Sequence, residues 1–168
     1  MSLCKPKYTI NITTNKYLFL DIDGVLNSFD DYQVDGKEFL ENIENLTFIL
    51  SDRQISLLNK IIDKYHPKII LSSYWRNRYS LKTLQNKFKD AGFKGKILAI
   101  TPSFGGEHED RWQQIKHYID DNDVSEYIIL DDSPLDRKNT KFPNWIKTDS
   151  YHGLDHKHLR EIDKIWEK

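Results

Sequence analysis

The chain has little of several features that define whole classes of protein. Its single cysteine, Cys4, excludes an internal disulfide, and the position near the terminus argues against a catalytic thiol. No apolar run approaches the roughly 18 residues that a membrane-spanning helix needs, and no signal-peptide pattern opens the sequence. The formal net charge is only -1, so the overall charge favours no class of partner. These absences predict a cytoplasmic protein that does not bind a membrane.

The apolar content is sufficient for one buried core. With 168 residues, of which 38% are hydrophobic, the chain is long enough for one domain and short for two. We predict a single domain over residues 1–168, with an N-terminal extension over 1–16 and a small flap over 28–50. Asp35-Gly36 lies between two short apolar stretches and indicates a hairpin in this flap. Oligomeric state cannot be read from the sequence.

Short apolar runs, typical of strands buried on both faces, alternate with amphipathic stretches. The predicted strands cover residues 17–20, 68–71, 96–100, 127–130 and about 145–147. The predicted helices begin at the capping residues Ser51, Ser80 and Asp110, and a last helix covers about 155–166. Gln54 follows Ser51 at the spacing of a capping box. Right-handed crossovers then give a three-layer α/β/α sandwich with a central, mainly parallel Rossmann-like sheet and no large cap domain.

Polar residues follow three of the predicted strands, at the edge where open α/β folds build their sites. They are Asp21 and Asp23 with the turn residue Gly24, Ser72 and Ser73, Asp131 and Asp132, and Arg111 at the start of the helix before the last pair. Four converging acids repel one another unless a cation lies among them. Oxygen ligands without histidine or cysteine favour Mg²⁺ over Zn²⁺. A cation with a hydroxyl, a guanidinium and a helix N-terminus suits a phosphate dianion.

These motifs resemble those of the haloacid dehalogenase (HAD) superfamily of phosphotransferases. Its order of strand plus DxDG, strand plus Ser or Thr, a basic residue, and strand plus DD extends over nearly the whole chain. More narrowly, FLDIDGVLNS, ILSSYWR, the TP before Arg111, ILDDSPLD and the late GL are similar to the HAD domain of the Swiss Army Knife RNA repair proteins. The resemblance implies a Mg²⁺-dependent phosphatase that forms an aspartyl phosphate and acts on RNA or DNA ends.

The resemblance also implies a role for each acid. Asp21 would be the nucleophile that attacks phosphorus, and Asp23 would protonate the leaving alcohol and then activate water. Magnesium would be bound by Asp21, by the main-chain carbonyl of Asp23, and by Asp131 and Asp132. Which of the last two touches the metal directly stays open, although the DDS ending suggests Asp132.

The phosphate contacts implied by the resemblance have alternatives. Ser73 is expected to bind a phosphate oxygen because the family places this hydroxyl two residues before a tryptophan, and Ser72 is the alternative. Arg111 would replace the lysine common in the superfamily, since an arginine also neutralises charge, and Lys96 is a weaker candidate. Arg76 would supply a second contact or form a surface ion pair.

The absence of a cap-sized insertion predicts an open site that can accept a large substrate. Between Tyr74 and Lys96, seven basic residues stand against one acid, and Tyr74, Trp75 and Tyr79 lie near the expected site. Basic side chains beside exposed aromatics bind single-stranded nucleic acids, although a solvated helix face has the same composition.

Two other functions remain open from the sequence. The first is a phosphatase of phosphoproteins or nucleotides, which DDSP supports because uncapped phosphoprotein members have a similar ending. The second is a non-catalytic phosphate-binding or receiver-like module. A receiver has its acid pair at the first strand and a lysine at the fifth, whereas here a DxD opens the series and a DD closes it.

Overall fold

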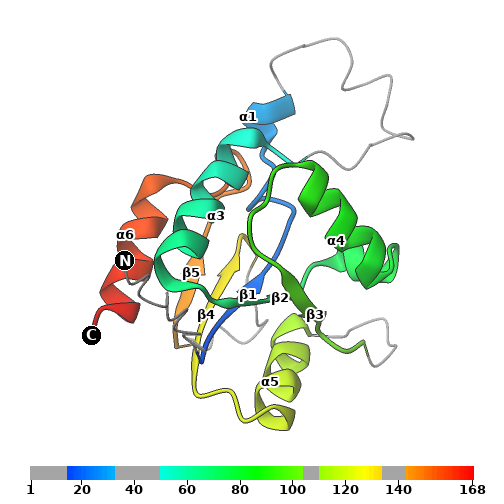
Figure 1. The fold of residues 1–168 in the computed structure, drawn as a ribbon, viewed down its shortest axis with the longest axis vertical. Helices are drawn as coiled ribbons and strands as arrows, with labels where there is room; N and C mark the ends of the chain where they lie inside the picture. The colour runs from blue at the N-terminus through cyan, green and yellow to red at the C-terminus, as the bar shows by residue number, and fades with distance from the viewer. Residues whose placement is uncertain (1–14, 33–49, 104–109, 134–142) are drawn as a thin grey trace, which may run out of the picture.

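The computed structural model describes residues 15–32, 50–103, 110–133 and 143–168, which form a five-stranded sheet between helices (Figure 1). The strands are β1 (Lys16–Leu20), β2 (Lys68–Leu71), β3 (Ile97–Ile100), β4 (Glu126–Asp131) and β5 (Trp145–Lys147). All neighbouring strands pair in parallel, in the order β3-β2-β1-β4-β5. The predicted α/β fold with a parallel Rossmann-like sheet is therefore confirmed.

The strand order reverses between β1 and β4. From β1 the chain moves outward to β2 and β3, and it then returns to the other side of β1 as β4. Leu20 at the end of β1 lies opposite Leu71 of β2 and Leu130 of β4. The carboxyl ends of β1 and β4 therefore meet at the reversal point, which is where open α/β sheets bind ligands.

Helices cover both faces of this sheet (Figure 1). They are α1 (Phe29–Tyr32), α3 (Asp52–Tyr65), α4 (Leu81–Asp90), α5 (Arg111–Asp121) and α6 (His156–Trp166), with a short 3-10 helix, η3 (Tyr74–Asn77). Leu18 and Leu20 of β1 join the core under α3, α4 and α6, whereas Phe19 joins the core under α5 with Ile115. This alternation follows from the two-residue period of a strand and produces the three predicted layers.

The observed elements agree closely with the sequence prediction. Each predicted strand is found with its ends shifted by at most one residue, and α3, α4 and α5 begin directly after Ser51, Ser80 and Asp110. The short helices α1 and η3 were not predicted, because four residues are too few for a periodic pattern. The predicted hairpin lies outside the described residues. No helix in the described ranges combines the length and the apolar character required to cross a membrane.

The predicted capping box at the start of α3 is wrong. The Ser51 side chain makes no capping hydrogen bond and instead donates its hydroxyl to Asp31 Oδ1 at 2.8 Å. Gln54 is fully buried, and its amide donates to the carbonyl of His152 at 3.1 Å. Both side chains therefore form hydrogen bonds with residues distant in the sequence instead of the local bonds of a capping box.

Candidate active site

Asp21 lies in the centre of the sheet edge, directly after β1. Its main-chain N–H donates to the carbonyl of Leu130 at 3.0 Å, and its Oδ1 accepts from the N–H of Ile22 at 2.8 Å. The residue is only 3% exposed. Burial, and next the charge of Asp131, raise the pKa of Asp21 from 3.8 to about 7, although Arg111 opposes the rise. A buried carboxyl with a pKa near neutrality is typical of a functional site.

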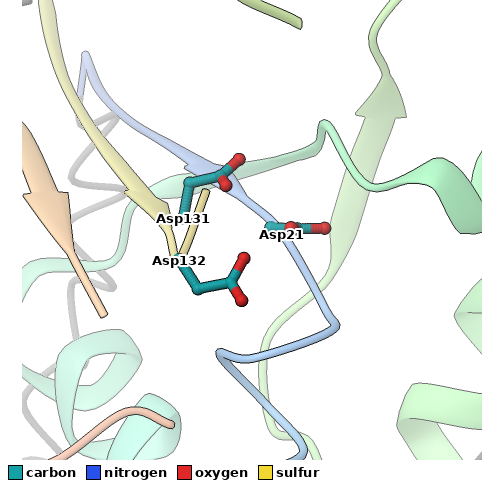
Figure 2. A group of neighbouring side chains, drawn as sticks. All are labelled: Asp21, Asp131 and Asp132. Atoms are coloured by element: carbon teal, nitrogen blue, oxygen red, sulfur yellow. The ribbon is translucent and has the colours of Figure 1, made fainter. Parts of the chain in front are cut away.

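Three carboxyl groups converge at this edge (Figure 2). One oxygen each of Asp21, Asp131 and Asp132 lies within 4.8 Å of the other two. Burial raises the pKa of Asp132 as well, against the hydrogen bond that Ser150 donates to it at 2.7 Å. An oxygen-only set in which one arginine faces three acids fits a hard divalent cation, which would favour the ionised carboxylates.

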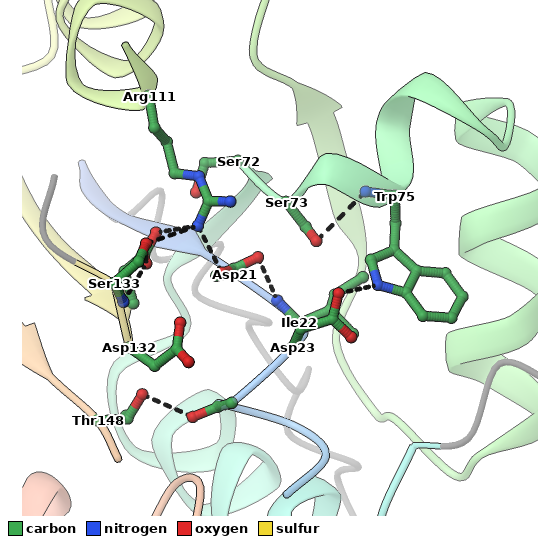
Figure 3. A network of polar contacts seen from close by, with 12 residues as sticks. Asp21, Ile22, Asp23, Ser72, Ser73, Trp75, Arg111, Asp132, Ser133 and Thr148 are labelled. Carbon is green, nitrogen blue, oxygen red and sulfur yellow. Dashed lines mark hydrogen bonds and ion pairs between the residues drawn. The ribbon is translucent and has the colours of Figure 1, made fainter. Parts of the chain in front are cut away.

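Arg111 is the basic residue that the structure brings to the three acids. It opens α5, whose first turn is capped by Asp110, as Asp110 Oδ1 accepts from the N–H of Trp112 at 3.0 Å. Its Nη1 donates to Asp21 Oδ2 (Figure 3) and, at 2.6 Å, to Asp131 Oδ2. The alternative candidate, Lys96, is exposed just before β3. The choice of Arg111 over Lys96 is therefore supported by its position.

Gly24 allows the turn after β1 to pass against the acidic cluster. Its φ is +69°, and a Cβ atom there would lie 2.1 Å from Asp132 Oδ2. Its N–H donates to Asn27 Oδ1 at 3.0 Å, and its carbonyl accepts from Thr148 Oγ1 at 2.8 Å. The turn therefore requires glycine both for its backbone angle and for the space that Asp132 occupies.

A Gly24→Ala protein is expected to lose cation binding as well as stability. The left-handed backbone angle costs an alanine roughly 1–2 kcal/mol, and the added methyl group displaces Asp132. Gly92→Ala is the matched control, because Gly92 has a φ of +81° and no atom within 4 Å of the added Cβ. Urea denaturation should show a loss of stability for both variants that is larger for Gly24→Ala, because only there does the added methyl group meet other atoms. Calorimetry with Mg²⁺ should show weaker binding for Gly24→Ala alone. Equal cation affinities in the two variants would contradict the assigned role of Gly24.

Asp23 is exposed on the same turn, and both of its carboxylate oxygens accept hydrogen bonds. Trp75 Nε1 donates to Oδ2 at 2.6 Å (Figure 3). Asn27 Nδ2 donates to Oδ1 at 3.0 Å. The first donor comes from η3 and the second from the turn itself. The side chain of Asp23 is therefore oriented from two directions, although no packing encloses it.

The two serines after β2 are both buried beside Asp21. The Ser73 hydroxyl stabilises the charged form of Asp21 and opposes the rise of its pKa, while accepting weakly from the N–H of Trp75 at 3.4 Å. The Ser72 hydroxyl is fully buried and has no hydrogen-bond partner within the part of the chain that the structure describes. The geometry therefore favours Ser73 as the hydroxyl that contacts Asp21 and leaves Ser72 as the alternative.

Arg76 contacts main-chain and side-chain oxygens of the protein. Its Nη1 donates to the carbonyls of Ser72 at 2.9 Å and Ser73 at 2.7 Å, and its Nη2 donates to the side chain of Gln114. These bonds join the segment after β2 to α5. They favour a role in holding the two serines, and a phosphate contact from Arg76 stays a prediction.

Several contacts of the site were missed by the sequence analysis. Asn27 and Thr148 fix the turn, Ser133 donates to Asp131 Oδ1 through both its hydroxyl and its N–H, and Ser150 donates to Asp132. The only sequence signal was the position of Ser133 directly after the DD pair, where a small polar residue can bond back to an acid. The other partners lie on segments whose approach to the site depends on the fold.

The stability of the metal-free protein is expected to depend on the pKa of Asp21. Because this pKa is about 7 in the folded protein and 3.8 ordinarily, folding takes up a proton between these values. The stabilisation is therefore complete below 3.8 and is lost as the pH rises toward 7. A bound divalent cation favours the ionised carboxylates and stabilises the folded state, so it should flatten this decline. Melting temperatures recorded across this pH range with and without Mg²⁺ test the prediction, and parallel curves would contradict it.

The sequence of the chain matches the model of a known protein family. The model of a family described as the HAD domain in Swiss Army Knife RNA repair proteins matches residues 17–159. The matched span begins in β1 and ends in α6, so it contains the acidic cluster, both serines, Trp75 and Arg111. Neither a curated protein nor a solved structure matches the chain.

Proposed function

The chain belongs to the family of HAD domains found in Swiss Army Knife RNA repair proteins, and from this premise we propose that it is a Mg²⁺-dependent phosphatase of RNA or DNA ends. The observation that carries the proposal is the geometry of Asp21. This carboxylate is buried at the strand reversal, next to two further acids and in contact with the guanidinium of Arg111. A site of this kind combines a nucleophile with the positive charge that a phosphate dianion requires.

The first step transfers the phosphoryl group to the protein. A carboxylate oxygen of Asp21 attacks phosphorus, a new P–O bond forms, and the bond to the leaving alcohol breaks. The electron pair of the broken bond stays on the leaving oxygen, which takes a proton from the carboxyl group of Asp23. Arg111 and the Ser73 hydroxyl contact the phosphate oxygens and stabilise the charge that develops on them.

The second step regenerates the carboxylate. Water attacks the phosphorus of the aspartyl phosphate while Asp23, now ionised, accepts its proton. The P–O bond to Asp21 breaks, and its electron pair returns to the carboxylate. Asp23 serves both steps because the first leaves it ionised and the second restores its proton.

The acidic cluster is the proposed magnesium site. Asp21, Asp132 and the carbonyl of Asp23 would hold the cation, with Asp131 behind them. Asp131 already accepts from Arg111 at 2.6 Å and from the Ser133 hydroxyl at 2.7 Å, which favours Asp132 as the direct ligand. A bound Mg²⁺ ion supplies charge neutralisation between the carboxylates and the phosphate.

The surface next to Ser73 supports a polynucleotide substrate. Tyr74 follows Ser73 directly and is 59% exposed, and the guanidinium of Arg78 lies over its ring at 5.8 Å. The ammonium group of Lys87 lies over the ring of Tyr79 at 5.4 Å. An exposed aromatic face such as that of Tyr74, with cations nearby, is of the kind that binds the bases and the backbone of single strands, whereas the ring of Tyr79 is half-buried. The family match gives no support to the receiver-like alternative.

A matched substrate panel tests the proposal. Phosphate release should be measured with and without Mg²⁺ from RNA and DNA oligonucleotides phosphorylated at either end, mononucleotides, a phosphoserine peptide and an aryl phosphate. Cation-dependent release from one oligonucleotide end, absent in an Asp21→Asn blank, is the expected result. Preference for the peptide or for mononucleotides would contradict the proposed nucleic-acid substrate and would leave the proposed reaction mechanism unchanged. No release from any substrate would overturn the proposed function.

A further inference from the structure

The indole of Trp75 donates a hydrogen bond to Asp23 at 2.6 Å, which is shorter than the 3.0 Å bond from Asn27. Trp75 lies in η3, directly after the segment that carries Ser73 (Figure 3). We propose that Trp75 is a positioning residue, which holds the Asp23 carboxyl toward the leaving oxygen during proton transfer. The inference rests on the proposed phosphatase function. It assigns two tasks to η3 and the residue before it, because Ser73 would orient the phosphate while Trp75 orients the acid.

Asp23 needs such a partner because it lies on an exposed turn. An unrestrained carboxyl group there would rotate among several rotamers, and only a fraction would point at the leaving oxygen. Trp75 Nε1 at 2.6 Å and Asn27 Nδ2 at 3.0 Å each bond a different oxygen of the carboxylate. Each oxygen keeps further lone pairs, so one of them can still carry the proton that is transferred.

The indole is itself fixed by its surroundings. The rings of Trp75 and Tyr79 are stacked, with centroids 5.5 Å apart and an interplanar angle of 20°. Both rings pack against the main hydrophobic core. The indole is thus held by Tyr79 and by the core, and its position does not depend on the turn that carries Asp23.

The chemical type of this donor suits an acid that must also act as a base. The indole N–H only donates, and it carries no charge. A lysine or arginine in its place would favour the ionised carboxylate and so oppose proton donation in the first step. Trp75 can bond to Asp23 in either protonation state, which is the property that a two-step exchange requires.

The test separates proton donation from every other contribution. Trp75→Phe retains an aromatic ring that can stack on Tyr79, and it removes the N–H donor together with the five-membered ring of the indole. Lost packing should affect both substrates, whereas the lost donor should affect only the one that needs a proton. Rapid-quench measurements should compare the first phosphoryl transfer from an alkyl phosphate with that from para-nitrophenyl phosphate. The alkyl leaving group needs a proton and the nitrophenolate does not, so we expect the alkyl reaction to slow by about 10- to 100-fold and the aryl reaction to change little.

Controls distinguish this inference from the function on which it rests. Trp166→Phe makes the same change in α6, away from the acidic cluster, and should leave both rates unchanged. Equal slowing of both substrates by Trp75→Phe, or no slowing, would overturn the inference while the wild-type protein remains active. An inactive wild-type protein would overturn the proposed function and this inference together.

Discussion

Replacing Asp21 by asparagine is expected to reduce phosphate release by at least about 10⁴-fold, because a carboxamide cannot form the aspartyl phosphate. When the wild-type protein is mixed rapidly with para-nitrophenyl phosphate, it should, in contrast, become phosphorylated. Hydroxylamine should release this phosphoryl group. Quenched samples analysed by mass spectrometry should show the added phosphate on the peptide that contains Asp21. The same peptide should stay unmodified in Asp21→Asn.

The Asp21→Asn variant should lose phosphatase activity without losing stability. Asp21 is 3% exposed, and burial next to Asp131 raises its pKa to about 7, so its charge opposes folding in the metal-free protein. Asparagine has nearly the same shape, and its amide oxygen can still accept from the N–H of Ile22. The metal-free variant should therefore melt at pH 7 no lower than the wild type, as expected where function conflicts with stability.

Asp23→Asn is the matched control for the Asp21→Asn substitution. This variant keeps Asp21 and should release nitrophenolate once, because that leaving group needs no proton. The second step should then be slow, since water has no base, and the phosphorylated protein should accumulate. Equal levels of phosphorylation in the Asp21→Asn variant and in the Asp23→Asn variant would exclude Asp21 as the nucleophile.

The sequence predicted four converging acids, and the structure groups three of them, Asp21, Asp131 and Asp132. The fourth, Asp23, instead directs its carboxylate to hydrogen bonds from Trp75 and Asn27. Parallel strands place their carboxyl ends at one edge, so acids after two central strands must meet there once the strand order is known. Asp21 and Asp131 follow this logic directly, as their strands are neighbours in register. The position of Arg111 could be predicted as well, because Asp110 marks the start of its helix.

The contacts that orient the acids could not be predicted in this way. The bond between Trp75 and Asp23 joins residues 52 positions apart, and it depends on the path of a four-residue 3-10 helix. Ser51 has the spacing of a local cap, yet its hydroxyl bonds to Asp31, which the fold brings within 2.8 Å. Side-chain hydrogen bonds have several possible partners with similar energies, and only the tertiary structure decides among them.

Arg111→Gln is expected to lower kcat/KM by roughly 10²- to 10³-fold, the usual effect of removing one donor to a developing oxyanion. Arg111 lies at the centre of the anionic site, where its side chain is 24% exposed and pairs with two acids that are almost fully buried. Glutamine leaves these acids without a cationic partner. The variant should therefore also be less stable in the absence of metal, and part of that stability should return with Mg²⁺.

Arg111→Lys separates charge from shape at the same position. The contacts of Arg111 with Asp21 Oδ2, Asp131 Oδ2 and Ser133 Oγ all run through the single atom Nη1, with 2.6 Å and 3.5 Å to the last two. A lysine ammonium can supply one such point of charge, whereas it cannot replace a two-pronged guanidinium contact. Lysine should therefore retain kcat/KM within about tenfold of the wild type. A loss of kcat/KM as large as that of Arg111→Gln would mean that both terminal guanidinium nitrogens bind the phosphate. The geometry of arginine, rather than its charge, would then be what the reaction requires.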